Sequence, residues 1–457
     1  MGSDWTEVSL SELTTKITKG TTPTKKDGGF SSEGVNYIKS EAVTFDGRID
    51  ESKFTFISSE IHKKLKRSQL EESDILMSMA GIHLGKTAIV RTRHLPANTN
   101  QALALIRPIR NKIYPDYLFY FLQQSSVVYF INNSTSQSAQ PNINLQEIGS
   151  LNIKYPEYNE QKAIAHILGS LDDKIELNRQ MNETLEAMAQ ALFKSWFVDF
   201  DPVIDNALAA GNAIPDELLE RAEQRQAIEK KDNSDIQNLF PNAFEFTEEM
   251  GWIPKGWGVS KLGEYIEVKR GGSPRPIHDY LVPKGLPWVK ISDATASNSR
   301  FLVETKQFIK PEGLNKTTLL KKGSLILSNS ATPGLPKFLD LDACIHDGWL
   351  HFPKKKIFTD NYLYQLFLVV RQELLMQGNG SVFTNLKTDI LKNHMVVVPN
   401  IDVLNYFDNW INSFHNKIHA VQIDVDNLSR IRDTLLPKLM SGELRIPDAE
   451  ALVDEVL

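Results

Sequence analysis

Hydrophobic residues recur at alternating intervals of three and four along residues 159–200. A spacing of this kind, kept over about four heptads, is typical of a coiled-coil seam and not of the wider apolar face of a globular helix. We therefore predict a long central helix that packs on a partner helix. Its seam comprises Ile164, Ile167, Leu171, Lys174, Asn178, Met181, Leu185, Met188 and Leu192.

The same spacing returns 243 residues later, near the end of the chain. Seven of the nine positions are apolar in each series, and both series carry their polar breaks near the middle. Connectivity requires the two helices to run antiparallel if their seams pack together. A pseudo-twofold near Asn178 and Val421 then places Lys174 opposite Asp424. The second seam comprises Phe407, Trp410, Phe414, Lys417, Val421, Asp424, Leu428, Ile431 and Leu435.

The segments before the two helices also resemble each other, which indicates an internal repeat. A Gly/Pro turn at 19–23 matches one at 270–274, and the strand-like run 36–39 matches 287–290. A later apolar run at 74–78 matches 324–328, again bounded by turn residues. An aromatic-rich helical stretch, a polar loop and a strand closing on proline complete both halves. The order is domain, helix, domain, helix.

This organisation predicts an α+β protein with two mixed α/β domains separated by two long antiparallel coiled-coil helices. Residues 201–252 are predicted to be a linker with a short, highly charged helix that begins at Pro215. The predicted ranges are 1–157 for the first domain, 158–200 for the central helix, 201–252 for the linker, 253–400 for the second domain, and 401–457 for the C-terminal helix and tail.

The composition indicates the cellular environment of the protein and an uneven distribution of charge along the chain. The single cysteine, Cys344, excludes an intramolecular disulfide, and neither a membrane span nor a secretory signal is visible, so we expect a cytoplasmic protein. The net charge of −6 conceals alternating blocks: +3 over 1–156, −12 over 157–252, +8 over 253–400 and −5 over 401–457. Two basic blocks alternating with acidic, helical ones are what an electrostatic footprint on a polyanion would look like.

Two stretches resemble catalytic motifs but depart from them in spacing or in position. Gly81-Ile-His-Leu-Gly85-Lys86-Thr87 resembles a phosphate loop, but it has three residues between its glycines where four are needed. Asp172-Asp173-Lys174 resembles the end of a nuclease motif, but it lies in the helix seam. The ten histidines show no paired spacing of metal ligands. We therefore predict no catalytic residue and no metal site in this chain.

Amide and basic side chains in the two basic blocks are suited to DNA. Asparagine and glutamine can bond adenine edges bidentately, whereas lysine and arginine can meet phosphates or guanine. The seam from Ile164 to Leu192 rises roughly 42 Å. This length could hold two DNA-binding domains about one turn of B-DNA apart. The candidate DNA-binding residues are Lys19, Thr21, Lys39, Lys86, Asn98, Asn100, Gln101, Gln137, Gln140, Asn142, Arg270, Arg275, Lys290, Ser328, Asn329, Ser330, Lys337, Asn379, Ser381, Asn385 and Lys387.

Four stretches resemble the specificity subunit of Type I restriction-modification enzymes. They are 193–202 (FKSWFVDFDP), 239–241 (LFP), 251–257 (GWIPKGW) and 434–444 (TLLPKLMSGEL). Together with the repeat, the resemblance covers the whole chain. The loop at 378–381 looks like a family loop near the DNA, whereas 134–138 lacks the corresponding glycine.

The resemblance implies two target recognition domains, each reading half of a bipartite DNA site, and helices that set the gap between the half-sites. It also implies two modification (methyltransferase) subunits docked on the helices, joined by translocating restriction subunits. S-adenosylmethionine, ATP and Mg²⁺ would then belong to those partners, and this chain would have no active site of its own.

The sequence leaves two alternative functions for the chain. A coiled-coil adaptor with two protein-binding domains would explain the helices, but not the basic blocks. A self-sufficient nuclease or methyltransferase is disfavoured by the missing motifs.

Overall fold

The computed structural model describes residues 5–24, 26, 28–81, 84–134, 142–228, 234–296, 299–377 and 385–457. The chain divides into two compact units. Unit 1 holds residues 1–177 and 424–457, and unit 2 holds residues 178–423. Both boundaries fall inside the long helices α5 (Tyr158–Phe197) and α12 (Ile401–Ser441), so each unit contains a segment of both. No helix in the described part of the chain is long and apolar enough to cross a membrane.

Unit 1 is built on a sheet of order β2-β8-β5-β6, a smaller sheet of order β4-β3-β7, and the antiparallel pair β1-β9. The central strand β5 is a short, fully buried apolar run, because it has neighbours on both sides and is covered on both faces. The strands are β1 (Thr6–Ser9), β2 (Thr14–Lys19), β3 (Val35–Ile38), β4 (Thr55–Ile57), β5 (Ile75–Ser78), β6 (Thr87–Ile89), β7 (Ala97–Thr99), β8 (Leu103–Pro108) and β9 (Asn152–Tyr155).

Unit 2 repeats this pairing. Its sheet of order β13-β22-β19-β20-β16 extends the order of unit 1 by one strand, and the parallel pair β15-β21 matches β3-β7. The antiparallel pair β12-β23 matches β1-β9. The matched strands are β12 (Gly258–Lys261), β13 (Ile266–Arg270), β15 (Leu286–Val289), β19 (Leu325–Ser328), β20 (Pro336–Leu339), β21 (Ala343–Ile345), β22 (Trp349–Lys355) and β23 (Met395–Val398).

Of the remaining strands of unit 2, β17 pairs antiparallel with β15 as β4 does with β3, and the others are additions to that pattern. One sheet has the order β14-β17-β15-β21-β18, and a separate hairpin pairs β10 with β11. These strands are β10 (Phe244–Thr247), β11 (Gly251–Pro254), β14 (Leu281–Val282), β16 (Phe301–Leu302), β17 (Phe308–Ile309) and β18 (Thr318–Leu320). The predicted internal repeat and the α+β class are confirmed by the pairings that the two units share.

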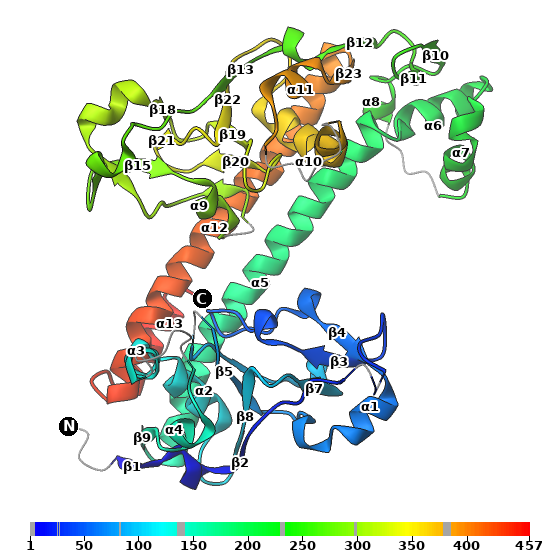
Figure 1. Ribbon diagram of the computed structural model, residues 1–457. Helices are drawn as coiled ribbons and strands as arrows, with labels where there is room; N and C mark the ends of the chain where they lie inside the picture. Colours follow the sequence, from blue (N-terminus) through cyan, green and yellow to red (C-terminus); the bar gives the residue numbers. More distant parts are fainter. Residues whose placement is uncertain are drawn as a thin grey trace. The chain divides into compact units, whose positions relative to one another are not determined.

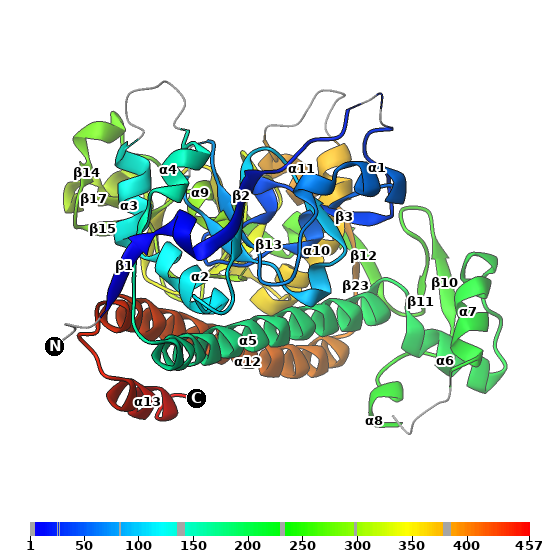
Figure 2. The same ribbon diagram turned by 90° about the horizontal axis from the view of Figure 1, so that it is seen from below.

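A buried helix lies between the main sheet and the long helices in each unit (Figure 1, Figure 2). In unit 1 it is α2 (Pro115–Gln123), which begins with proline in its first turn and buries every residue from Tyr117 to Leu122. In unit 2 it is α10 (Asp360–Met376), capped by the Thr359 hydroxyl. Helices with neighbours on several sides are apolar all round, which explains the aromatic-rich sequences. The shorter helices are α1 (Ser59–Lys64), α3 (Ser125–Ser134), α4 (Leu145–Gly149), α9 (Ile291–Thr295), α11 (Thr388–Asn393) and α13 (Ile446–Asp454).

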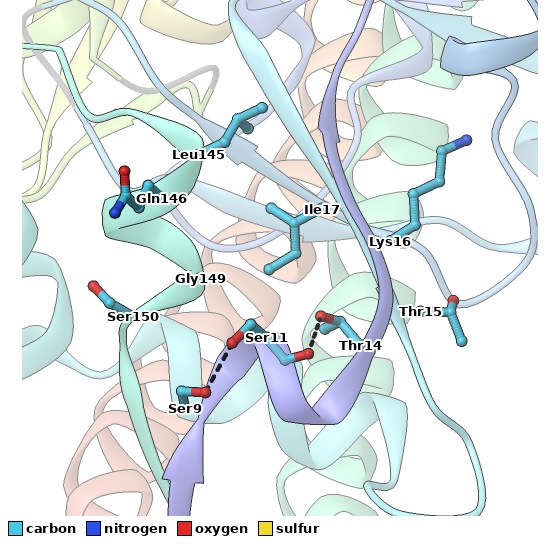
Figure 3. A pocket seen from close by; sticks show the side chains of 10 residues that line it. All are labelled: Ser9, Ser11, Thr14, Thr15, Lys16, Ile17, Leu145, Gln146, Gly149 and Ser150. Atoms are coloured by element: carbon cyan, nitrogen blue, oxygen red, sulfur yellow. Dashed lines mark hydrogen bonds between the residues drawn. The ribbon is translucent and has the colours of Figure 1, made fainter.

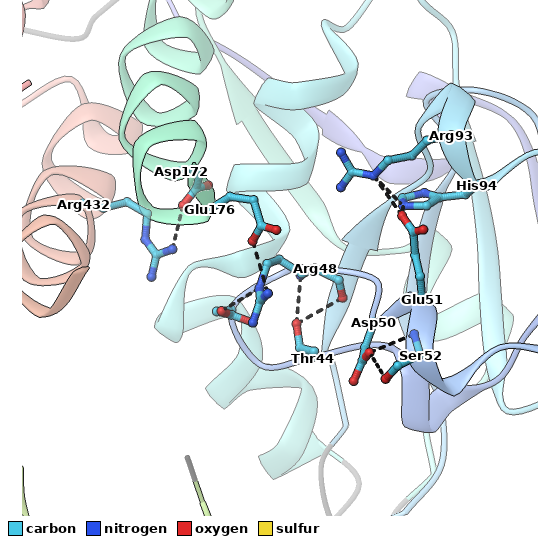
Figure 4. Close-up of polar contacts among 11 residues, drawn as sticks. Thr44, Arg48, Asp50, Glu51, Ser52, Arg93, His94, Asp172, Glu176 and Arg432 are labelled. Carbon is cyan, nitrogen blue, oxygen red and sulfur yellow. Dashed lines mark hydrogen bonds and ion pairs between the residues drawn. The ribbon is translucent and has the colours of Figure 1, made fainter. Parts of the chain in front are cut away.

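The segments of α5 and α12 pack antiparallel inside each unit, as predicted. In unit 1, Arg432 of α12 donates to Asp172 of α5 at 2.7 Å (Figure 4). Tyr120 of α2 donates to the same carboxylate at 2.7 Å. In unit 2, the rings of Phe193 and Phe407 lie 5.8 Å apart. Asp172 is therefore a structural residue of the helix packing.

The predicted seam is correct for part of its length. The structure buries Ile164, Ile167, Leu171, Asn178, Phe407, Val421, Leu428 and Leu435. It half-buries Lys174, Leu185, Leu192, Phe414 and Ile431. The prediction is wrong for five positions, because the structure exposes Met181, Met188, Trp410, Lys417 and Asp424.

The physical reason is the pitch of the helix. A straight α-helix has 3.6 residues per turn, so a stripe drawn at a strict 3.5-residue spacing drifts around the surface. The buried positions follow the longer period: Ala189 is buried beside exposed Met188, Ile411 beside exposed Trp410, and Val425 beside Asp424. In unit 1 no ion pair joins Lys174 to Asp424 among the described residues, and the register is set instead by Asp172 and Arg432.

The described residues of 201–252 belong to unit 2. They contain α6 (Asp201–Ala210), α7 (Leu219–Gln226), α8 (Ser234–Gln237) and the β10-β11 hairpin. Val203, Phe240 and Ile253 are buried in the same core as Phe193. The charged helix α7 is present, and Arg221 and Arg225 pair with the buried carboxylates of Asp201 and Asp205 on α6. It is therefore a surface helix, exposed over most of its length and tied to α6 by two ion pairs.

A buried arginine connects the strands of unit 2 to both long-helix segments. Arg300, whose side chain is fully buried, donates Nε and Nη2 to the two oxygens of Glu186 on α5, both at 2.5 Å. Its guanidinium lies 4.6 Å from the Tyr364 ring centre and 3.5 Å from Nδ1 of His415 on α12. Burial and, after it, the positive charge of Arg300 lower the pKa of His415 to about 4.

We predict that Glu186→Ala destabilises the protein by about 3 kcal/mol, because it leaves the buried Arg300 guanidinium without its counter-charge. The measurement is equilibrium unfolding in urea. Glu183→Ala is the matched control, since Glu183 lies on the same helix with its side chain exposed. Equal midpoints for the two variants would contradict the role given to Glu186.

We also predict that stability falls as the pH drops from about 6.5 towards 4. The unfolded chain protonates His415 near pH 6.5, whereas the folded protein resists protonation until about pH 4. The stabilisation is therefore fully present above pH 6.5 and is lost on acidification. His415→Phe keeps a ring against Phe338 and should flatten the pH dependence of the unfolding free energy by on the order of 1–3 kcal/mol. His278→Phe, at a largely exposed site, is the control substitution.

Candidate nucleic-acid interface

Loops from four strands meet at one edge of unit 1. The N–H of Thr21 donates to the Thr99 carbonyl at 2.9 Å, and that of Met79 donates to the Ala102 carbonyl at 2.9 Å. Asn142 forms an isolated bridge with Ala80. These bonds gather the ends of β2, β3, β5 and β7. We call residues 19–21, 39, 79–80, 100–102 and 142 edge 1.

Unit 2 builds the same edge with equivalent bonds. The N–H of Gly272 donates to the Ile345 carbonyl at 3.1 Å, and that of Asn329 donates to the Gly348 carbonyl at 2.8 Å. Ser330 bridges with Asn385, as Ala80 does with Asn142. We call residues 270–275, 290, 329–330, 346–348 and 385–387 edge 2. The repeat therefore extends from the strands to the loops.

One glycine in each edge permits this close approach. A Cβ added to Gly20 would lie 2.2 Å from the carbonyl oxygens of Thr99 and Asn100. A Cβ added to Gly271 would lie 2.4 Å from the His346 carbonyl oxygen. No side chain fits at such distances, so glycine is required because of the neighbouring backbone and not because of its own torsion angles.

Six predicted residues lie together in edge 1. Lys19, Gln101 and Asn142 are exposed there, and Thr21, Lys39 and Asn100 are half-buried. The Lys39 ammonium lies 4.5 Å from the ring centre of Phe30. The exposed side chains offer cations and amides, which are the groups that meet phosphates and base edges.

Two predicted residues of unit 1 have structural contacts instead. Asn98 is fully buried and donates to the Leu65 carbonyl and to Ser68, so the prediction that it binds DNA is wrong. Lys86 donates to the carbonyls of Ser40 and Val43, and its partial burial lowers its pKa. The amide of Asn98 is needed by buried polar groups, which a sequence pattern does not reveal. Gln137 and Gln140 lie outside the described residues.

Edge 2 collects a second set of predicted residues. Arg270, Arg275, Asn385 and Lys387 are exposed there, and Lys290 and Ser330 are half-buried. Asn379 and Ser381 lie outside the described residues.

Three predicted residues of unit 2 are buried. Ser328 and Asn329 are held by the Thr332 and Asp347 carbonyls, and Lys337 donates to the Ser299 carbonyl. Burial lowers the pKa of Lys337 to about 8. The prediction that these three bind DNA is wrong, because β19 and β20 turn their side chains into the unit.

The structure adds Ser273, His346 and Asp347 to edge 2. Asp347 accepts from the Ser273 hydroxyl at 2.8 Å and lies 2.9 Å from His346 Nε2. The strand registers of β7 and β21 make Asp347 the counterpart of Gln101. The sequence could have identified this residue, because extending the repeat beyond the matched strands aligns Asp347 with Gln101.

A hollow and further ion pairs lie elsewhere in the described part of unit 1. A hollow of about 520 Å³ in unit 1 is lined mainly by hydroxyl and apolar groups of β1, β2 and α4, among them Ser9, Thr14, Ile17 and Ser150 (Figure 3). Within the described ranges, no group of histidine, cysteine, aspartate or glutamate side chains could hold a metal ion. The remaining ion pairs of unit 1, such as Arg48–Glu176 and Arg93–Glu51, tie loops to neighbouring elements (Figure 4).

The glycine geometry yields a prediction. Gly271→Ala should destabilise unit 2 by about 1–3 kcal/mol, because the backbone at Ile345 and His346 must move away from the new methyl group. Gly258→Ala is the control, since its Cβ would make an ordinary 3.6 Å contact with Val398. Thermal unfolding measures both. A Gly271→Ala midpoint no lower than that of the control would show that the edge tolerates the change.

The chain matches the family model described as Type I restriction modification DNA specificity domain, over residues 2–187 and 254–421. It is 28% identical over 377 residues to the specificity subunit of the Type I restriction enzyme HindI from Haemophilus influenzae, covering 74% of this chain and 80% of the relative. It is 25% identical over 377 residues to the MjaIX specificity subunit from Methanocaldococcus jannaschii, covering 80% of this chain and 76% of the relative.

The fold is also similar to a crystal structure of a Type I restriction-modification system S subunit from M. genitalium. The TM-score is 0.51 at 15% identity, and the match covers 95% of this chain and 96% of that one. The resemblance predicted from the sequence is confirmed, and the adaptor hypothesis is not favoured. The family is that of a subunit without an active site of its own. This chain belongs to the Type I restriction-modification DNA specificity family.

Proposed function

We propose that this chain is the sequence-recognition subunit of a Type I restriction-modification complex, with edge 1 and edge 2 each reading one half of a bipartite DNA target. The observation that carries the proposal is the repeated edge. Both units gather the same loops with equivalent hydrogen bonds, yet present different side chains, such as Gln101 in one and Asp347 in the other. One scaffold with two sets of exposed polar groups suits two different half-sites.

The charge distribution supports the same proposal. Block 253–400, which includes edge 2, carries a net charge of +8, although the whole chain carries −6. Cations near the recognition loops would bind phosphates and fix the register, while amides and guanidinium groups read base edges. The same contacts would make binding weaken steeply with salt.

The long helices are the proposed docking surface for two methyltransferase subunits. In unit 2 they expose Met181, Met188, Trp410 and Ile423, which are large apolar side chains on otherwise polar faces. Met and Trp are enriched at protein interfaces. Restriction subunits would join through the methyltransferases. S-adenosylmethionine, ATP and Mg²⁺ would be bound by those partners, in the cytoplasm.

A methylation map tests the proposal. The chain is expressed with its methyltransferase partner in a host that lacks DNA methylation, and N6-methyladenine is located by sequencing. We expect a split motif that disappears when this chain is omitted. Exchanging residues 253–400 for those of a relative should change only one half of the motif.

Absence of any motif, although the subunits co-purify, leads to a second measurement. Binding of the purified complex to random-sequence duplexes is followed as salt is raised. Binding that is undetectable at every salt concentration would exclude DNA recognition and restore the adaptor reading.

A further inference from the structure

Asp347 is the centre of a polar cluster in edge 2. Its carboxylate accepts from Ser273 Oγ at 2.8 Å and from Arg275 Nη2 at 3.3 Å, and it lies 2.9 Å from His346 Nε2. Its backbone carbonyl accepts from the Arg270 guanidinium, with Nη2 at 3.0 Å, and from the Asn329 amide at 3.3 Å. Both exposed arginines of the edge therefore touch one residue.

An acidic side chain at this position should lower the affinity of edge 2 for DNA. A carboxylate facing DNA repels phosphates, so it would weaken binding if it only occupied the surface. Partial burial alone would raise the pKa of Asp347, but the Ser273 hydrogen bond and the neighbouring His346 and Arg275 charges lower it below its ordinary value. The charge is therefore kept, which favours a role in orienting its cationic neighbours.

Arg275 is the neighbour that is free to reach a ligand. Its side chain is 74% exposed, whereas that of Asp347 is 35% exposed. Only one nitrogen of its planar guanidinium faces the carboxylate, so further N–H donors point elsewhere. A guanidinium held on one side by a carboxylate is limited in rotation and presents its remaining donors in a fixed direction.

The ligand chemistry follows from these donors. Guanine offers two acceptors, O6 and N7, side by side in the major groove, and a bidentate arginine is their usual partner. A phosphate can also be bound by lysine, which acts as a point charge, so it does not require an oriented guanidinium. In unit 1 the matching position holds the neutral Gln101, so the two edges differ at this point.

We propose that Asp347 is a specificity-determining, positioning residue of edge 2, and that it holds Arg275 so that its guanidinium reads a guanine in the half-site of unit 2. This inference rests on the proposed function and adds the base class and the residues that select it.

The test is a methylation map of complexes carrying Arg275→Ala or Asp347→Asn. Both variants should relax the same guanine position, in the half of the motif that follows unit 2, and raise methylation at sites with another base there about tenfold. The other half should stay unchanged. Gln101→Ala should relax only the opposite half. Asp342→Asn, which breaks an exposed pair with Lys321 in the same unit, is the matched control and should leave the motif intact.

Two results would overturn the inference while leaving the proposed function standing. One is a wild-type motif whose unit 2 half contains no guanine. The other is an Asp347→Asn complex that retains full selectivity at the guanine that Arg275→Ala relaxes. If the wild-type chain directs no motif and its complex prefers no sequence, the proposed function itself fails.

A variant complex that no longer methylates is examined by binding. Its affinity is measured for the target duplex and for a duplex with the guanine replaced, and its melting temperature is compared with the wild type. Equal affinities at an unchanged melting temperature support the inference. A retained preference for guanine contradicts it.

Discussion

The packing of the last helices into unit 1 is the constraint on which the rest of the structure depends. Val425, Leu428, Leu435 and Leu439 of α12 share a core with Ile164 and Leu171 of α5 and with the aromatic residues of α2. Without residues 424–457, that apolar surface of unit 1 would face water. The helices α2 and α5 of unit 1 therefore depend for their cover on the opposite end of the chain.

Buried charges give this packing a definite register. Apolar side chains on two helices can slide past one another at little cost, but an arginine that loses its carboxylate in a buried site cannot. Asp172 and Arg432 fix the helix segments in unit 1, and Arg300 with Glu186 fixes a segment to the strands of unit 2. In edge 2 the contacts are exposed instead: Arg275 meets the carboxylate of Asp347, and Arg270 meets its backbone carbonyl.

Periodicity and repetition predicted the architecture well, because both reflect the backbone directly. The two helices, their antiparallel packing and the matched strands all follow from spacing and order. Side-chain roles were harder to predict. Asn98 and Ser328 have the chemistry of base readers, but they satisfy buried backbone groups, and only the fold determines which way a strand turns them. The helix stripe failed at Met181 and Trp410 because a small difference in pitch accumulates along a long helix.

The division of the chain also affects the order of events during synthesis. Unit 2 is contiguous, from residue 178 to residue 423, whereas unit 1 is split between the two ends. A ribosome thus completes every residue of unit 2 before it supplies the last segment of unit 1, which takes roughly another 2–7 s at ordinary elongation rates. The helices α2 and α5 of unit 1, although made first, have to wait with an uncovered apolar face. The half of the protein that is translated first is the half that matures last.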